Sequence, residues 1–176
     1  MTNVAVLTDS TASLPEAILD KLKIKTVAYY IHRGQEVLRD LVTIQREDFL
    51  RWMVTARFAP TTASPSPVDY LNAYEELAGN GAEAIISIHM SSKISGGYQA
   101  AALAQCMLKE NHPGLRVVVI DTLNASMCQG WMVMEAARAA ISGVSLDQIT
   151  ALVKNMIPIS HMIQTAALAT SVTSHT

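Results

Sequence analysis

The chain has 176 residues, of which 50% are hydrophobic and 16% are charged, and its formal net charge at pH 7 is −2. This composition excludes an intrinsically disordered chain, because disordered chains bury too little apolar surface to offset their ordering entropy. The near-neutral charge argues against nucleic acid as a partner, and no uncharged apolar run reaches the roughly 18 residues that an integral membrane segment needs.

The first half of the chain alternates predicted strands and helices. Ser13 and Glu16 have the spacing of a capping box, which predicts a helix start. The segment 58–67 holds three of the six prolines and predicts a loop, because proline lacks the N–H group that strands and helix interiors use. In chain order, the predicted elements are a buried strand over 4–8, a short helix after 14, a β-rich run over 25–32 with a turn into 36–39, and a helix over 45–56.

The second half repeats a unit of one buried strand followed by one helix. Ser66 and Ser145 are the expected caps of two of these helices. The predicted strands cover 84–90 and 115–120, and the predicted helices cover 67–79, 98–109, 127–141 and 146–156. Strands that alternate with helices imply right-handed crossovers and parallel pairing. The expected fold class is therefore α/β, with a mostly parallel sheet flanked by helices.

The loops that follow the predicted strands, and the proline-rich loop, are rich in hydroxyl side chains. In open α/β sheets, ligands bind beyond the carboxyl ends of the strands, where loops meet helix N-termini. Hydroxyl groups and the free N–H groups of a helix N-terminus form a neutral cradle for an oxyanion, and Gly96 and Gly97 permit close approach of the backbone. Any one of these residues alone is more often a cap or a turn residue, but the whole set predicts a binding site. The set is Thr8, Ser10, Thr11, Ser13, Thr61, Thr62, Ser64, Ser66, Ser91, Ser92, Ser95, Thr122 and Ser126.

A second interpretation is a small α/β enzyme acting on a phosphorylated or carboxylated metabolite. Its candidate catalytic groups are Ser95, His89 and Asp121. Ser95 lacks the preceding glycine of a nucleophile elbow, and the sequence holds no complete nucleophile–base motif. Glycine-rich phosphate loops are also missing, and the five histidines show no metal-ligand spacing. The sequence therefore favours binding without a catalytic group, a metal or a cofactor.

Four loop segments of residues 4–156 carry a family resemblance. They are DSTASLP at 9–15, TASPSP at 62–67, SSKISGGY at 91–98 and VIDT at 119–122. The residues of these four segments, their order and their spacing resemble those of the DegV family of fatty-acid-binding proteins. The resemblance implies a two-domain, non-enzymatic α/β protein that holds a long-chain fatty acid between its domains, with the carboxylate on a threonine and a serine. It also implies, for some bacteria, a fatty-acid kinase as the partner that converts the bound fatty acid to acyl phosphate.

The resemblance assigns the ligand-binding residues one by one. Thr62 and Ser95 would hold the carboxylate, and the surrounding positions are Ser10, Ser92, Gly96 and Gly97. Three positions depart from the family pattern. Ala63-Ser64 stands where the family usually has serine and glutamine, and Gly97 stands where it usually has threonine.

The length departs from the family as well, because the family continues into a second domain. We expect residues 1–157 to form the N-terminal α/β domain and 158–176 to be a poorly ordered remnant of the interdomain segment. Residues 167–176 lose the family pattern, which indicates a frame disruption or a truncation. The resemblance implies a binding tunnel between the two domains, and without the second domain this tunnel becomes an exposed apolar groove, which favours self-association. A fragment that folds but binds nothing is the third interpretation.

The expected compartment is the cytoplasm. The apolar run at residues 4–7 is too short for the core of a signal peptide, and no basic residue precedes it. Cys106 and Cys128 are isolated, which does not indicate a disulfide framework.

Overall fold

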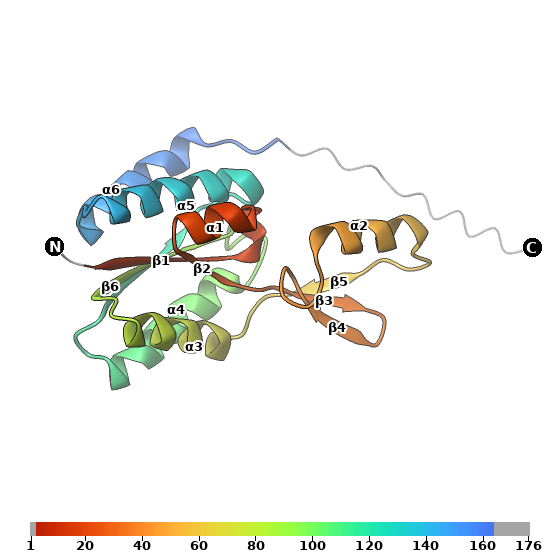
Figure 1. Cartoon of the computed structure of the whole chain (residues 1–176), viewed down its shortest axis with the longest axis horizontal. Helices are drawn as coiled ribbons and strands as arrows, with labels where there is room; N and C mark the ends of the chain where they lie inside the picture. The colour runs from red at the N-terminus through yellow and green to blue at the C-terminus, as the bar shows by residue number, and fades with distance from the viewer. Residues whose placement is uncertain (1–2, 164–176) are drawn as a thin grey trace, which may run out of the picture.

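A computed structural model describes residues 3–163, and a parallel sheet forms its centre (Figure 1). The sheet holds four parallel strands in the order β2-β1-β6-β7. These strands are β1 Val4–Asp9, β2 Ile24–Val27, β6 Ala84–His89 and β7 Arg116–Asp121. Every residue of β6 is buried, as expected for an inner strand covered on both faces. The predicted α/β class with a mostly parallel sheet is confirmed.

Two layers of helices cover this sheet, one on each face (Figure 1). One layer contains α1 Glu16–Lys21, α5 Ser126–Ile141 and α6 Leu146–Met156, and the other contains α3 Pro67–Gly79 and α4 Gly97–Asn111. Alternate residues of the strands feed the two cores. Val6 and Ile86 belong to the cluster that includes Met132 of α5, whereas Leu7 and Ile85 belong to the cluster that includes Tyr70 of α3.

A second, antiparallel sheet projects from the parallel sheet as an arm, with one helix packed on it (Figure 1). Its strand order is β4-β3-β5. The elements are β3 Tyr30–Arg33, β4 Glu36–Arg39, β5 Thr61–Ala63 and the helix α2 Arg46–Thr55. Its small core joins Ile31, Leu38 and Ile44, with Phe49 of α2 packed against them.

The β-rich run over 25–32 forms two strands, because the chain leaves β2 after Val27 and enters β3 at Tyr30. One sequence prediction in this arm is wrong. The predicted loop over 58–67 contains β5, whose Thr62 pairs with Ile31. Pro60 and Pro65 flank this strand, and since proline cannot donate to a ladder, only a short stretch between them is free to pair.

The predicted helix caps have different outcomes. Ser66 and Ser145 each form a complete capping box, with Asp69 and Gln148 respectively, and both predictions are confirmed. The capping box predicted at Ser13 is wrong. The Ser13 backbone is in the left-handed helical region, with φ of 57°, and Ser13 ends a turn of 3-10 helix over Ser10–Ala12. The helix α1 begins only after Pro15 and has no side-chain cap.

The last element described is a turn of 3-10 helix, Ile157–Ile159, that follows α6. Most of the predicted remnant 158–176, and all of 167–176, lies outside the described residues. Among the helices that the structure describes, none is both long and apolar enough to cross a membrane.

Candidate functional site

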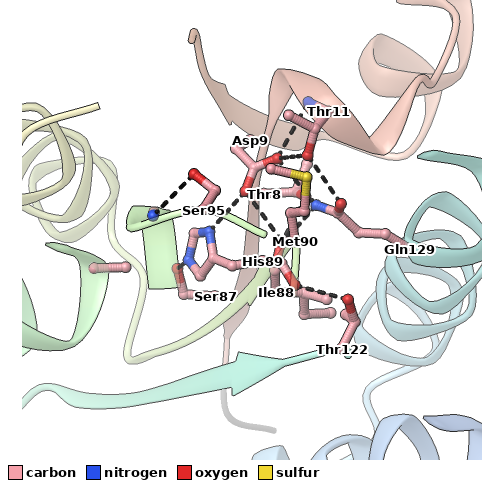
Figure 2. Close-up of polar contacts among 12 residues, drawn as sticks. Thr8, Asp9, Thr11, Ser87, Ile88, His89, Met90, Ser95, Thr122 and Gln129 are labelled. Atoms are coloured by element: carbon pink, nitrogen blue, oxygen red, sulfur yellow. Dashed lines mark hydrogen bonds and ion pairs between the residues drawn. The ribbon is translucent and has the colours of Figure 1, made fainter. Parts of the chain in front are cut away.

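A chain of buried polar side chains lies at the carboxyl ends of β1 and β6 (Figure 2). His89 Nδ1 is 3.1 Å from Asp9 Oδ2, and His89 Nε2 is 2.6 Å from Ser87 Oγ. Tyr74 of α3 donates its hydroxyl to Ser87 Oγ at 2.9 Å. All four side chains are fully buried, so their polar atoms must pair with one another rather than with water.

The Asp9 carboxylate is the centre of this network. Gln129 of α5 donates its amide to Asp9 Oδ1 at 3.1 Å, and the backbone N–H of Thr11 donates to the same oxygen at 3.1 Å. Burial by itself would raise the pKa of Asp9. Hydrogen bonding and charge attraction from His89, with hydrogen bonds from Thr11 and Gln129, outweigh burial and hold that pKa below its usual value. Asp9 therefore stays ionised and fixes the loop that follows β1.

The structure does not assemble the three candidate catalytic groups. Both ring nitrogens of His89 face Ser87 and Asp9, and neither faces Ser95. Asp121 Oδ1 accepts the backbone N–H groups of Ser92 and Leu123, at 3.1 and 3.0 Å. The roles of these side chains are to hold loops in place.

Ser95 is placed at the start of α4 by a tight turn. The N–H groups of Ile94 and Ser95 both donate to the carbonyl of Ser91, at 2.9 and 3.1 Å. Ser95 is half-buried, and its Oγ accepts the N–H of Gly97 at 3.4 Å and lies 2.7 Å from the hydroxyl of Tyr29. A partly exposed hydroxyl therefore stands beside a helix N-terminus, whose first N–H groups have no partners within the helix.

The two predicted glycines lie beside this hydroxyl. Gly96 is exposed, and a Cβ placed on it would lie 3.5 Å from Ser64 Oγ, so the segment after β5 reaches the start of α4. Gly97 is buried, and a Cβ there would lie 2.5 Å from the Tyr29 hydroxyl. The predicted grouping of Ser95, Gly96 and Gly97 at one loop thus has a physical basis.

The other predicted site residues have different surroundings. Thr62 is exposed on β5, on the same face of the arm as its partner Ile31. Ser10 is buried, and its Oγ accepts the backbone N–H of Tyr29 at 3.1 Å. Ser92 is half-buried, with its backbone N–H taken by Asp121. Ser10 therefore supports the site from behind, whereas Thr62 is open to a ligand.

An open groove of about 760 Å³ begins beside the Ser95 loop. Its apolar lining includes Met90, Ile94, Met127 and Met162, and Ile94 is the chain neighbour of Ser95. A polar cradle and an apolar groove thus share one loop. Within residues 3–163, no cluster of three or more side chains suited to a metal ion occurs.

Sequence reasoning missed Tyr29 as part of this site. Tyr29 lies in the β-rich run over 25–32, where an aromatic residue is expected simply because it favours strands. Its contact with Ser95 spans 66 positions, and no local pattern reports such a distant pairing.

Comparison with known proteins agrees with this fold. The model of the DegV family, described as an uncharacterised protein family, matches residues 3–167. A DegV domain-containing protein of Listeria monocytogenes is 35% identical over 146 residues, which are 83% of this chain and 50% of the relative. The protein DegV of Bacillus subtilis is 31% identical over 143 residues, or 81% of this chain and 49% of its own.

Solved structures are similar as well. A DegV family protein from Thermus thermophilus, whose structure is described as showing fatty acid binding, has a TM-score of 0.78 at 32% identity and covers 89% of this chain. DegV from Bacillus subtilis, described as a fatty acid binding protein, has a TM-score of 0.82 at 29% identity and covers 90%. The similar regions are 54% and 55% of those two chains, so this chain spans about half the length of the relatives it matches. With its four loop segments and its parallel sheet in place, the chain belongs to the DegV family.

Proposed function

We propose that this domain binds a long-chain fatty acid and holds its carboxylate at the amino end of α4, against the Ser95 hydroxyl. The observation that carries this proposal is the half-buried Ser95 hydroxyl beside a helix N-terminus and next to an apolar groove. Helix N-termini favour anions through their free N–H groups and their partial positive charge. The two similar structures described as fatty acid binding support the same ligand class.

The remaining proposed contacts follow the same geometry. Thr62 would supply a second hydroxyl from β5, because Ser64, two residues further on, already reaches Gly96. Gly96, with no side chain, leaves the helix N-terminus open, and Ser92 and Ser10 hold the loop and Tyr29 behind it. The acyl chain would enter the groove, whose volume of about 760 Å³ is within the range of small-molecule sites.

The first test is chemical analysis of what the purified protein carries. We expect denaturing mass spectrometry of an organic extract to detect a fatty acid, and titration with palmitate to give saturable binding. Ser95→Ala and Thr62→Ala should each weaken binding by about 1–3 kcal/mol, because each removes a hydrogen bond to a charged oxygen.

Thr61→Ala is the matched control, since Thr61 is also exposed on β5 but points to the opposite face of the strand. Unchanged palmitate affinity in the Thr62→Ala, Ser95→Ala double variant would refute the assigned site.

We further propose that the domain boundary lies near residue 157, that the protein is not an enzyme, and that a fatty-acid kinase is its partner. The separation of His89 and Asp121 from Ser95 supports a non-catalytic role.

The open groove favours self-association, because Met127 and Met162 are partly exposed along it. Light scattering over a range of concentrations tests this, and a strictly monomeric protein without ligand would contradict it.

A further inference from the structure

Tyr29 is held rigidly at the point where the chain passes from the parallel sheet to the arm. Its N–H donates to Ser10 Oγ at 3.1 Å, and its carbonyl accepts the N–H of Asp40 at 2.9 Å. Only 6% of the residue is exposed, and its hydroxyl lies 2.7 Å from Ser95 Oγ. The backbone of Tyr29 is thus fixed on both sides of the residue, and its buried phenol lies against Ser95.

The protons of this pair can be assigned from their surroundings. Among residues 3–163, Ser95 is the only hydrogen-bond partner of the Tyr29 hydroxyl. Burial, together with the nearby Asp9 carboxylate, raises the pKa of Tyr29 to about 12, so the phenol keeps its proton at neutral pH. A buried proton needs an acceptor, and the acceptor within reach is Ser95 Oγ.

This donation leaves the hydroxyl proton of Ser95 free. A serine oxygen has two acceptor positions and one proton. Tyr29 and the N–H of Gly97 occupy the two acceptor positions. The half-exposed Ser95 can then act only as a donor toward the solvent side, which is the role that binding a carboxylate requires.

The glycine at position 97 has a matching explanation. Glycine in the first turn of a helix carries an entropic cost, and Gly97 is not at a positive φ that would require it. A Cβ there would lie 2.5 Å from the Tyr29 hydroxyl and 3.2 Å from the Tyr70 hydroxyl. Any larger residue would displace the phenol from Ser95.

We propose that Tyr29 is a positioning residue of the ligand site: its phenol donates to Ser95 and turns the single Ser95 proton toward the bound carboxylate, while Gly97 leaves the space that this phenol needs. The inference rests on the proposed fatty-acid site and adds to it a residue that never touches the ligand.

The first experiment compares Tyr29→Phe with Tyr30→Phe. Both changes remove one phenol oxygen from adjacent residues, but Tyr30 donates to Asp69, away from Ser95. We expect Tyr29→Phe to weaken palmitate binding about tenfold and Tyr30→Phe to leave it unchanged. In the Ser95→Ala background, Tyr29→Phe should have no further effect, because the phenol acts through Ser95.

A spectroscopic measurement separates positioning from a general structural effect. The carboxyl ¹³C resonance of bound [1-¹³C]palmitate reports the hydrogen bonds to that group. Tyr29→Phe and Ser95→Ala should move this resonance in the same direction, and Tyr30→Phe should not move it. A resonance that Tyr29→Phe leaves in place would overturn the positioning role.

A ligand-free measurement tests the role of Gly97. Gly97→Ala should lower the unfolding temperature, because its Cβ meets the Tyr29 hydroxyl. Adding Tyr29→Phe should recover part of that loss, since the colliding oxygen is gone. Equal unfolding temperatures for Gly97→Ala with and without Tyr29→Phe would contradict this packing.

The outcomes distinguish the two proposals. If Ser95→Ala binds palmitate as tightly as the unaltered protein, the carboxylate site itself is wrong. If Ser95→Ala weakens binding and Tyr29→Phe does not, the site stands and the role given to Tyr29 is wrong.

Discussion

Asp9 is the residue on which the buried polar network depends. Its carboxylate accepts from Gln129 and from the backbone of Thr11, and it pairs with His89 in a region closed to water. The removal of one partner from a buried pair leaves polar groups unsatisfied, which costs more than the intact pair contributes. The loop after β1, which contains Ser10, therefore depends on the hydrogen bonds of this carboxylate for its stability.

We expect Asp9→Asn to lower the free energy of unfolding at pH 7 by about 3 kcal/mol, measured by urea denaturation. The pH dependence should change as well. The folded pKa of Asp9 lies below the ordinary value of 3.8 for an aspartate, so the stabilisation is fully present above that pH and is lost as pH falls through the lower folded value. Asp9→Asn should lose less stability on acidification than the unaltered protein.

Asp20→Asn is the control for this prediction, because Asp20 is exposed and its side chain makes no hydrogen bond or ion pair within the described residues. If both variants unfold at the same urea concentration, the network contributes little to stability.

Two tyrosines of α3 give a matched pair. Both are fully buried, but the Tyr74 hydroxyl donates to Ser87, whereas the Tyr70 hydroxyl has no hydrogen-bond partner among residues 3–163. Removal of an unpaired buried hydroxyl relieves a desolvation cost, and removal of a paired one loses a buried hydrogen bond. Tyr70→Phe should therefore be neutral or stabilise by up to about 1 kcal/mol, and Tyr74→Phe should destabilise by about 1–2 kcal/mol in thermal unfolding. The opposite order would show that Tyr70 has a partner such as a bound water.

At the scale of single elements, the sequence predicted correctly those features that depend on contacts between near neighbours in the chain. Ser145 and Gln148 lie three positions apart and cap α6 as expected, because both ends of a capping box belong to one turn. Ser13 has the same spacing to Glu16, yet the chain turns there, since Asp9 caps the preceding 3-10 turn by accepting from Thr11. A buried carboxylate thus overrides a local motif.

The two serines give a prediction for the helices. Ser145→Ala should lower the free energy of unfolding by about 1 kcal/mol, because it removes a cap that α6 uses. Ser13→Ala should cost clearly less, because Ser13 caps no helix. Chemical denaturation of the two variants checks this, and equal losses would mean that the Ser13 spacing does act as a cap.

Strand β5 shows where element prediction from sequence ends. Three exposed residues between two prolines carry no hydrophobic pattern, and they become a strand only because β3 offers a free edge. The same limit applies to the site. Ser95, Gly96 and Gly97 are neighbours in the chain and were predicted together, whereas Tyr29 joins them through tertiary packing.

At the scale of the whole molecule, two short connections join the parallel sheet and the arm. Ala28 and Tyr29 lie between β2 and β3 and are both buried, and residues 64–66 lead from β5 to α3. We expect palmitate to slow amide hydrogen exchange in β3 and β5 as well as in the first turn of α4, because the Tyr29 to Ser95 hydrogen bond connects these regions. Exchange in β7, on the far edge of the parallel sheet, serves as the internal control. Protection confined to α4 would mean that the arm does not respond to the ligand.

The position of Tyr29 at this junction has a mechanical consequence. The residue proposed to orient Ser95 also lies in one of the two connections between the parallel sheet and the arm, so a shift of the arm relative to the sheet would disturb the hydrogen bond between Tyr29 and Ser95. A protein that binds the arm, for example on the exposed Leu50 and Val54 of α2, and shifts it would change the affinity for the carboxylate. By thermodynamic linkage, the carboxylate would then change the affinity for that protein by the same factor. Binding at the arm and binding at the start of α4 would thus be coupled through the hydrogen bond between Tyr29 and Ser95.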